Sequence, residues 1–403
     1  MQEGEPSFDL LSLQMEEQKM NDFLKKAFQS YYLKPEISFP ERFSRREYAF
    51  IFWGEKQMVR HVSFKRREEL LSILRRRVPM HTYYSSAYYE KPDAPTMNEK
   101  NWMGADLIFD LDADHLPGAE KMDYGEMLKL VKKELQKLLS FLLDDFGFGE
   151  KNVEIYFSGG RGYHCHVKHP EVFQLGSQER REIVDYITGR GLDAKDIFGE
   201  KVVETKRYGE KVVPIKRLEM PRPDEPGWRG RISRAIIETV KEIRKGDKGI
   251  EKLMEYGISR TRAEKIMESL SDERIKRIEE GLLDQSPEIR RFFLKSAIDE
   301  VAVSLSTGKP DEPVTSDIKR LIRLPGSLHG KTGLRVQAVK IDEIEEFNPL
   351  DDAVVFGEDN VKIKVTRPFK IKMKGENFNL TPGEAEVPEY LAVFLVARKV
   401  ATF

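Results

Sequence analysis

The sequence predicts an α+β fold in which short strands surround a helical insertion. Runs of aromatic and β-branched residues, such as 46–53 and 58–64, are separated by turn residues, as in β-hairpins. The segment 123–146 instead repeats its apolar residues every three or four positions, which indicates an amphipathic helix. Residues 171–300 are heavily charged and mostly helical in character. Strands clustered around a helical block are the pattern of the α+β class.

The N-terminal part of the chain alternates between helices and strands. Residues 1–20 are polar and are predicted to form a flexible or weakly helical extension, and a helix is expected from Asn21. The basic segment 65–77 predicts a second helix, whose charges are expected on a solvated face. Beyond the first hairpin, strands are predicted at 83–89, 106–112, 153–157 and 163–167.

The C-terminal part returns to strands. Strands are predicted at 361–365 and 369–373, and a helix at 388–400 ends the chain. Ser316 is expected to cap a short helix that carries Ile318, Leu321 and Ile322 on its buried side. These elements divide the chain into a flexible extension at 1–20, one discontinuous domain at 21–170 and 301–403, and a helical insertion subdomain at 171–300.

The composition limits the class of protein. The chain has 403 residues, of which 39% are hydrophobic and 34% charged, so it can bury a sizeable core. No apolar run approaches the ~18 residues of a spanning helix and no signal-peptide pattern is present, so a cytoplasmic protein without a membrane partner is expected. The net charge of −1, from 68 basic and 69 acidic residues, argues against bulk electrostatic DNA binding but allows an enzyme with a local basic groove.

Asp110 and Asp112 form an Asp-x-Asp pair in the predicted strand 106–112. Residues two apart on a strand point to one face, so the two carboxylates stand side by side while Phe109 and Leu111 face the core. Two carboxylates this close repel each other unless a cation lies between them, and a hard divalent metal with oxygen ligands meets that need. The alternative is a pair of solvated carboxylates at a strand end, since a motif match is only a hypothesis.

A second motif, Ser-Gly-Gly-Arg-Gly-Tyr-His-Cys-His, occupies 158–166. Its glycines let the backbone approach an anion, and successive N–H groups in such a turn form an anion-binding nest. Arg161 offers a bidentate fork for phosphate, and His164 and His166 share one face of the return strand. The segment lacks the Lys-Ser/Thr ending and the following helix of a P-loop. A tight surface hairpin would explain the glycines but not the arginine and histidines, and a zinc pair of the two histidines lacks a third soft ligand close in sequence.

A third cluster follows near the C-terminal part of the discontinuous domain. Arg323, His329 and Lys331 flank a glycine-rich turn after Pro325, and groups of this kind suit a polyphosphate. The alternative is an ordinary basic surface loop. The three motifs together supply a carboxylate pair for metals and two cradles for anions. That combination fits nucleotidyl transfer with two metal ions, one at a 3′-hydroxyl and one at the triphosphate.

The three motifs, in this order, resemble those of the catalytic small subunit of archaeal and eukaryotic DNA primases. Residues 109–112 look like that family's metal motif, 157–164 like its second motif and 323–333 like its third. Upstream, Arg46-Glu47-Tyr48-Ala49-Phe50 and Arg60 are similar to its N-terminal signature. The resemblance runs from about residue 20 to the C-terminus and is strongest in the three motifs.

The resemblance implies an enzyme that joins nucleoside triphosphates into short primers on a single-stranded DNA template for replication. It implies Mg²⁺ or Mn²⁺ as cofactor, a primase large subunit as heterodimer partner, and an active site on an open mixed β-sheet of the discontinuous catalytic domain. Nucleotide contacts are expected from the following residues: Ser158, Arg161, His164, Arg323 and His329. Weaker candidates for phosphate or template contacts are Arg60, Lys331 and Lys91.

One departure from the family concerns zinc. Many members carry a small cysteine-cluster zinc module near the first two motifs, but the only cysteine here is Cys165, inside the second motif. Four soft ligands for a closed zinc site are therefore not available from cysteines, and structural zinc is not expected.

The third metal carboxylate has two candidates. Asp317 follows the expected Ser cap, where its charge favours a helix N-terminus, so it has a structural explanation. Asp311 lies between Pro310 and Pro313, and in the resembling family the third aspartate sits well upstream of His329. Asp311 is therefore the predicted third ligand beside Asp110 and Asp112.

Two rival functions remain open. A repair or damage-bypass polymerase of the same superfamily would share all three motifs, and a large-subunit partner would separate it from a primase. A non-catalytic nucleic-acid-binding module on a decayed primase fold is the other rival. The acidic pair argues against this module, because negative charge does not help to bind DNA phosphates.

Overall fold

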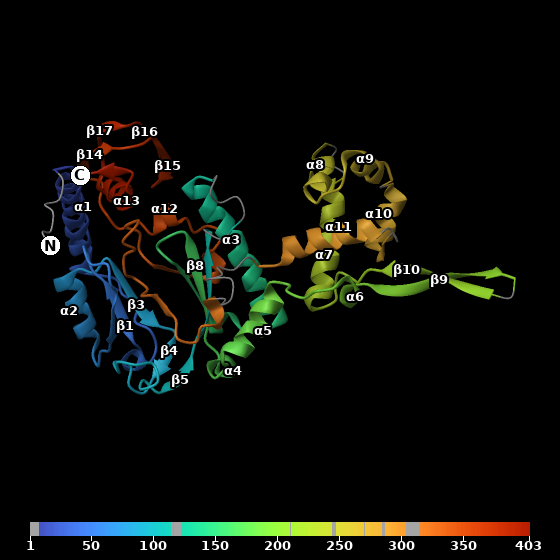
Figure 1. Cartoon of the computed structure of the whole chain (residues 1–403), viewed down its shortest axis with the longest axis horizontal. Coiled ribbons are helices and arrows are strands. Elements are labelled where there is room, and N and C mark those ends of the chain that lie inside the picture. Colours follow the sequence, from blue (N-terminus) through green and yellow to red (C-terminus); the bar gives the residue numbers. More distant parts are fainter. Residues whose placement is uncertain are drawn as a thin grey trace, which may run out of the picture. The chain divides into compact units, whose positions relative to one another are not determined.

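The chain forms two compact units (Figure 1). The structure, a computed structural model, describes residues 8–403 apart from 114–115, 117–121, 210, 244–246, 270, 284–286 and 304–313. Unit 1 comprises Met1–Gln136, Phe148–Val184 and Ser304–Phe403, and unit 2 comprises Lys137–Gly147 and Asp185–Val303. Helices and strands occur in both units, which confirms the predicted α+β class.

Two four-stranded sheets form the centre of unit 1. The first has the order β12 (Leu321–Arg323), β3 (His81–Ser85), β1 (Tyr48–Ile51) and β2 (Val59–Val62). The second has the order β13 (Gln337–Val339), β7 (Val153–Phe157), β8 (Gly162–Val167) and β6 (Leu107–Asp112). The predicted first hairpin and the strands of the first two motifs are thus confirmed. Every strand pairing in the described chain is antiparallel, whereas a mixed sheet was expected.

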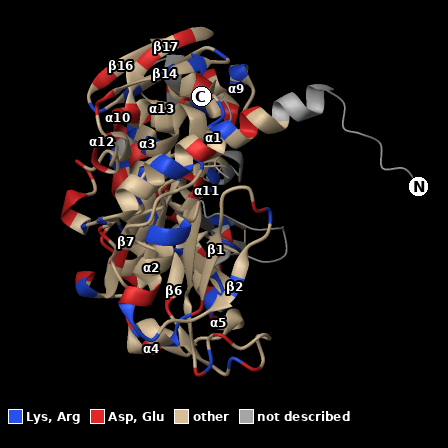
Figure 2. Ribbon diagram, turned by 90° about the vertical axis from the view of Figure 1, so that its left-hand side faces the viewer, with Lys and Arg blue, Asp and Glu red and all other residues tan. Residues whose placement is uncertain are grey.

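Smaller strand pairs and helices complete unit 1. A third sheet has the order β17 (Gly383–Pro388), β14 (Asn360–Val365) and β18 (Ala401–Thr402), and β15 (Phe369–Met373) pairs with β16 (Glu376–Leu380). The helices that begin in this unit are α1 (Phe8–Tyr32), α2 (Arg67–Arg77), α3 (Tyr124–Ser140), α4 (Pro170–Phe173), α5 (Ser177–Ile187), α12 (Pro349–Asp352) and α13 (Glu389–Ala397). Figure 2 shows acidic and basic residues scattered over the ribbon, in keeping with the net charge near zero.

Helix α1 begins at Phe8, although the sequence predicted its start at Asn21. Residues 8–20 contain no glycine or proline and are rich in leucine, methionine, glutamine and glutamate, which are good helix formers. The polarity of residues 1–20 and their few apolar core candidates leave a flexible and a weakly helical extension open, because these features do not separate an exposed helix from a flexible tail.

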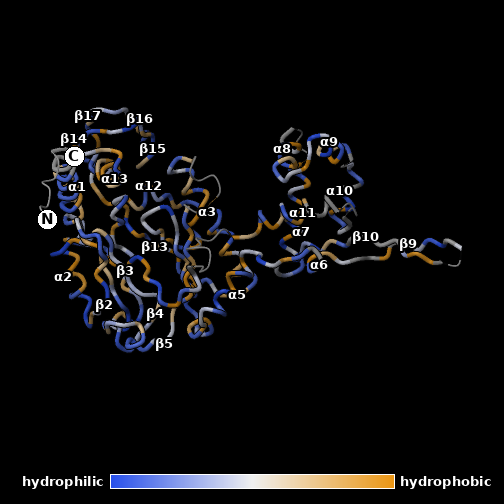
Figure 3. The backbone as a smooth tube through the Cα atoms, viewed as in Figure 1, coloured by the Kyte–Doolittle hydropathy of each residue, from blue (hydrophilic) through white to orange (hydrophobic). Residues whose placement is uncertain are grey.

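Helix α13 is apolar around its whole circumference, as its hydrophobic colour in Figure 3 shows. Its residues from Tyr390 to Val396 are all buried, and a helix that is apolar all round belongs in a core. The predicted terminal helix is therefore confirmed, and the core of unit 1 surrounds it. No helix in the described ranges is long and apolar enough to cross a membrane.

The residues between 314 and 323 differ from the prediction of a short helix. A single 3₁₀ turn covers Val314–Ser316, and the chain then enters strand β12. Ile322 pairs with Tyr84 of β3, so the apolar residues that suggested a buried helix face lie in a sheet instead. Pairing with a neighbouring strand satisfies the backbone here, and that partner is far away in the sequence. Asp317 is exposed, and its Oδ1 accepts a hydrogen bond from the Lys319 N–H at 2.8 Å.

Unit 2 contains a long β-hairpin that the sequence analysis missed. Strands β9 (Gly199–Tyr208) and β10 (Lys211–Glu219) pair antiparallel, and β11 (Leu282–Leu283) joins β10. Helices α6 (Ala194–Ile197), α7 (Gly227–Ile243), α8 (Asp247–Glu255), α9 (Arg260–Ser269), α10 (Asp272–Glu279) and α11 (Pro287–Val301) complete the unit. Even valines such as Val202 and Val212 are exposed on the hairpin, so no buried apolar face marks its strands. Its charged sequence therefore resembles that of the helices around it.

A buried polar network joins the beginning of β1 to the beginning of β6. The Arg46 guanidinium donates to the Asp106 carboxylate at 2.6 Å and to the carbonyl oxygens of Ser85 and Ser86 at 2.8 Å. The Tyr88 hydroxyl donates to the other Asp106 oxygen at 2.6 Å. Arg46 is fully buried, so its charge is neutralised only by groups inside the protein. Removal of either Arg46 or Asp106 would leave the other as a buried charge without its ion-pair partner.

Replacement of Arg46 by Met should therefore lower the free energy of unfolding by about 3–5 kcal/mol, because Asp106 loses its buried partner. Urea denaturation measured by circular dichroism checks this expectation. Lys340→Ala is the control, since the pair of Lys340 and Glu343 is exposed, and its unfolding midpoint should match the wild type. Equal midpoints for Arg46→Met and the wild type would contradict a structural role for the network.

Candidate active site

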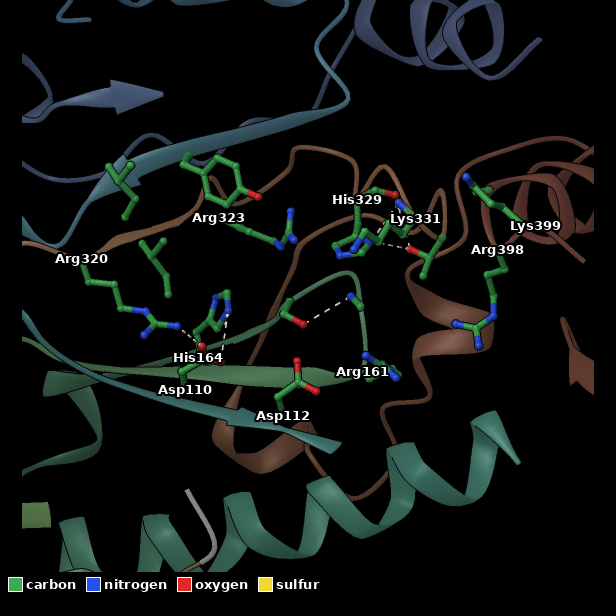
Figure 4. Close-up of a pocket in the computed structure, with 17 residues that line it drawn as sticks. Asp110, Asp112, Arg161, His164, Arg320, Arg323, His329, Lys331, Arg398 and Lys399 are labelled. Atoms are coloured by element: carbon green, nitrogen blue, oxygen red, sulfur yellow. Dashed lines mark hydrogen bonds and ion pairs between the residues drawn. The ribbon is translucent and has the colours of Figure 1, made fainter. Parts of the chain in front are cut away.

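A cavity of about 720 Å³ lies in unit 1 between the ends of the two large sheets (Figure 4). Strands β3 and β12 of the first sheet, β6 and β8 of the second, the loop around His329 and the end of α13 contribute to its wall. Its lining residues with polar or charged side chains are Tyr83, Asp110, Asp112, Ser158, Arg161, His164, Arg320, Arg323, His329, Lys331, Thr332, Arg398 and Lys399.

The two aspartates of the first motif point into this cavity from strand β6 (Figure 4). Along this strand Phe109 and Leu111 are buried while Asp110 and Asp112 are partly exposed, as the alternation of a strand requires. The Asp110 carboxylate accepts a hydrogen bond from the Arg320 guanidinium. This ion pair offsets part of the repulsion between the two neighbouring carboxylates.

The glycine-rich turn between β7 and β8 forms the floor beside the aspartates. The Ser158 N–H donates to the Gly162 carbonyl at 2.9 Å, and the Gly160 N–H donates to the Ser158 hydroxyl at 3.3 Å. Gly159 has a φ of +75°, and a Cβ added to Gly162 would lie 1.9 Å from the carbonyl oxygen of Leu111. Glycine adopts the left-handed backbone at 159 without strain, and no larger residue fits at 162, so the turn packs directly against the strand that carries Asp110 and Asp112.

His329 faces this turn from the opposite side. Its Nδ1 accepts a hydrogen bond from the Lys331 N–H at 3.3 Å, so in the neutral ring the proton is on Nε2. The Nε2 atom lies 3.1 Å from the position that a Cβ on Gly160 would occupy. The Thr332 hydroxyl donates to the Gly159 carbonyl, which ties the His329 loop to the turn. His329 is thereby placed to donate a hydrogen bond to an anion held at the turn.

A second histidine, His81 of β3, holds Arg323. Its Nδ1 lies 2.6 Å from an Arg323 guanidinium nitrogen and accepts the Gly330 N–H at 3.2 Å. The Arg323 guanidinium also lies over the Tyr83 ring, 5.1 Å from its centre. Burial, and then the charges of Arg323 and Lys331, lower the pKa of His81 to about 2. The neutral ring can therefore accept from the arginine at physiological pH, which fixes the guanidinium at the edge of the cavity.

The cavity carries a net positive charge. Six lysine and arginine side chains line it against two carboxylates. Burial lowers the pKa of His164 to about 4, with Asp110 opposing and Arg320 adding to the effect. Burial also lowers the pKa of His329 well below its usual value. Both histidines are then neutral at pH 7, and the excess cations favour a ligand with several negative charges.

The carboxylates fit a hard divalent cation. Asp110 and Asp112 offer oxygen donors on one face of β6, which suits Mg²⁺ or Mn²⁺. No group of three or more His, Cys, Asp or Glu side chains placed to hold a metal occurs among the described residues. The predicted third ligand, Asp311, lies outside the described residues. Cys165 is fully buried on β8, and burial raises the pKa of its thiol.

The structure brings most of the predicted site residues into one cavity, although they come from three separate motifs. Among the predicted site residues that the structure describes, the exceptions are Arg60 and Lys91, which do not line it. Arg60 lies on β2, where its Nε atom is 3.1 Å from Glu47 Oε1. Residues that the sequence analysis missed are His81, Tyr83, Arg320, Thr332, Arg398 and Lys399. Arg320 stood close to Arg323 in the third motif and was open to detection, but nothing local linked His81, Arg398 or Lys399 to the motifs.

The chain is similar to known DNA primase small subunits. A model of the DNA primase small subunit family matches residues 109–341. The DNA primase small subunit PriS of Methanothrix thermoacetophila is 45% identical over 96% of this chain and 99% of its own length. The proteins of the same name from Methanosarcina acetivorans and Methanosarcina barkeri are 44% and 45% identical, over 96% and 94% of this chain and 97% and 96% of their own lengths.

The stability of the chain should fall as the pH decreases, because the unfolded chain binds a proton at His81 that the folded chain does not. The pKa of His81 is about 2 in the folded chain and about 6.5 in the unfolded chain. Its contribution to the free energy of unfolding is therefore complete above pH 6.5 and declines below that pH. Between pH 7 and pH 5 this amounts to about 2 kcal/mol. Urea midpoints at both pH values should differ less in His81→Gln than in the wild type, and an unchanged difference would contradict the buried neutral imidazole.

Proposed function

This chain belongs to the DNA primase small subunit family, and on that premise we propose that it synthesises short primers from nucleoside triphosphates on single-stranded DNA during replication. The observation that carries the proposal is the single cavity in which a carboxylate pair adjoins a cation-lined cradle for anions. Primer synthesis needs both parts, because a metal-assisted attack must occur beside a bound triphosphate.

We assign the metal end to Asp110 and Asp112, with Asp311 as the proposed third ligand. When bound there, Mg²⁺ or Mn²⁺ would supply the charge stabilisation and hydroxyl activation of a two-metal nucleotidyl transfer. The Arg320 guanidinium, which pairs with Asp110 in the structure, would lose part of this interaction to a cation. His164 Nε2, 3.6 Å from Asp110 Oδ1, stays neutral and adds no competing positive charge.

The triphosphate end comprises the turn and the His329 loop. In the proposal, Ser158 and Arg161 contact phosphate oxygens from the turn, while His329 donates its Nε2 proton from the opposite side. Arg323 and Lys331 add positive charge at the rim of the cavity. Arg60 lies outside the cavity, so of the two contacts expected of it, phosphate or template, we propose the template.

A primase large subunit is the proposed partner, since the matched relatives are named as small subunits. The repair polymerase is the less favoured alternative, because all the named relatives are primase subunits. The non-catalytic module is disfavoured because the aspartate pair faces the cavity. A primer-synthesis assay on a single-stranded template, with and without Mg²⁺ or Mn²⁺ and with and without the large subunit, tests the proposal.

Replacement of Asp110, Asp112 or Asp311 by Asn should remove nearly all primer synthesis and leave the melting temperature close to wild type. Each substitution removes a metal-ligand charge but keeps the side-chain shape. Asp317→Asn is the matched control, because Asp317 is exposed and accepts only a local hydrogen bond. Retained synthesis in Asp311→Asn together with loss in Asp317→Asn would move the third ligand to Asp317.

Replacement of Arg161 by Ala should raise the KM for the nucleotide about 10- to 100-fold. This is the effect of losing a charge-assisted hydrogen bond of about 1.5–3 kcal/mol. Steady-state kinetics with a saturating template measure it, and Arg60→Ala should leave the KM for nucleotide unchanged. An unchanged KM in Arg161→Ala would reduce Arg161 to a turn residue.

A further inference from the structure

The C-terminal end of α13 brings two cations, Arg398 and Lys399, to the cavity wall. Both lie outside residues 109–341, the stretch that matches the primase small subunit family. The three motifs leave them without a role. Their place in the cavity is decided by the packing of α13.

Lys399 occupies a backbone position that usually belongs to glycine. It has a φ of +56°, its N–H donates to the Val396 carbonyl at 3.0 Å, and the Val400 N–H donates to the Leu395 carbonyl at 2.9 Å. These two bonds form a Schellman motif, in which the left-handed residue after the helix is most often glycine because a Cβ is disfavoured there. The local fold therefore favours glycine, and a lysine at this point is not explained by helix termination.

The lysine side chain also contributes little to packing. Its side chain is 76% exposed, and its Nζ is 3.6 Å from Glu17 Oε1, whose side chain is 61% exposed. An ion pair this open to solvent adds little to stability. A lysine in a strained position, with a weak partner and a place in the cavity wall, is suited to a ligand contact.

Arg398 is held next to the glycine-rich turn. Its guanidinium lies over the Tyr124 ring, 4.6 Å from the ring centre, and the Tyr124 hydroxyl donates to the Gly160 carbonyl. Tyr124 thus connects Arg398 to the backbone that forms the anion cradle. The planar guanidinium can stack on the ring and still present N–H groups at its edge.

The order of charged groups along the cavity gives the direction of a bound triphosphate. In Figure 4, Asp110 and Asp112 lie toward one end, Arg161 and His329 follow, and Arg398 and Lys399 lie at the other end. Under the proposed function the reacting α-phosphate lies at the carboxylates. The β- and γ-phosphates then extend along the cradle, and the γ-phosphate carries the largest share of the negative charge.

We propose that Arg398 and Lys399 form a subsite for the γ-phosphate, through which the protein prefers nucleoside triphosphates to diphosphates. The inference rests on the proposed function, because the aspartates determine which phosphate reaches the end of the cavity. A diphosphate that places its α-phosphate at the same aspartates ends short of this pair. Loss of the pair therefore weakens triphosphate binding selectively.

The test is the affinity of the full chain for ATP and for ADP, measured by isothermal titration calorimetry with Mg²⁺. Lys399→Gly should weaken ATP binding about tenfold, the effect of one charge-assisted contact, and change ADP binding less than twofold. Its melting temperature should not fall, because glycine suits the left-handed backbone. Arg398→Gln should also lose ATP preference, and Arg398→Lys should retain part of it.

Lys374→Gly is the matched control. Lys374 is likewise an exposed lysine with a left-handed backbone, at a φ of +52°, and it does not line this cavity. Lys374→Gly and Glu17→Gln should both have the same ratio of ATP affinity to ADP affinity as the wild type. The subsite would be overturned if Lys399→Gly and Arg398→Gln both kept the wild-type ratio of ATP affinity to ADP affinity. It would also be overturned if both variants lost affinity for ATP and ADP equally. In either case, primer synthesis by the wild type would still support the proposed function. Absence of ATP binding by the wild type would overturn both.

Discussion

The buried ion pair between Arg46 and Asp106 links the two central sheets of unit 1. Arg46 directly precedes the first hairpin, and Asp106 directly precedes the strand that carries Asp110 and Asp112. Because the Arg46 guanidinium is fully buried, water cannot replace Asp106 as its partner. The guanidinium also donates to the carbonyl oxygens of Ser85 and Ser86, which fixes the chain where β3 ends. The segments that lead into the two walls of the cavity are therefore linked through one charge that must be neutralised internally.

Within the cavity, positive and negative charges are separated by function. The aspartates stand with Arg320 as their partner, while the other cations come from β12, the glycine-rich turn, the His329 loop and the end of α13. Histidines mediate between the cations without adding charge, since burial keeps His81 and His329 neutral. A neutral His81 accepts from Arg323, and a neutral His329 keeps a proton for a ligand, so one residue type serves in two opposite hydrogen-bonding roles.

Sequence reasoning worked where short-range patterns carry the information. The strands of the first two motifs, the amphipathic helix α3 and the apolar helix α13 were predicted because their side-chain periods are visible within a few residues. It failed in two different situations. Strand β12 reads as a helix until its distant partner β3 is beside it. The hairpin of β9 and β10 pairs neighbouring segments, but it was missed because its exposed strands lack a clear apolar face.

The sequence by itself determined the chemistry of the site: a carboxylate pair, a glycine-rich anion cradle and a basic loop, each recognisable from residues that are close together in the chain. Only the tertiary structure decided that these three segments line one cavity, that Arg398 and Lys399 join them, and that His81 holds Arg323. The physical reason is that these residues reach the site through sheet pairing and through the packing of an apolar helix. Such contacts join residues that are distant along the chain, and no local pattern of residue types records them.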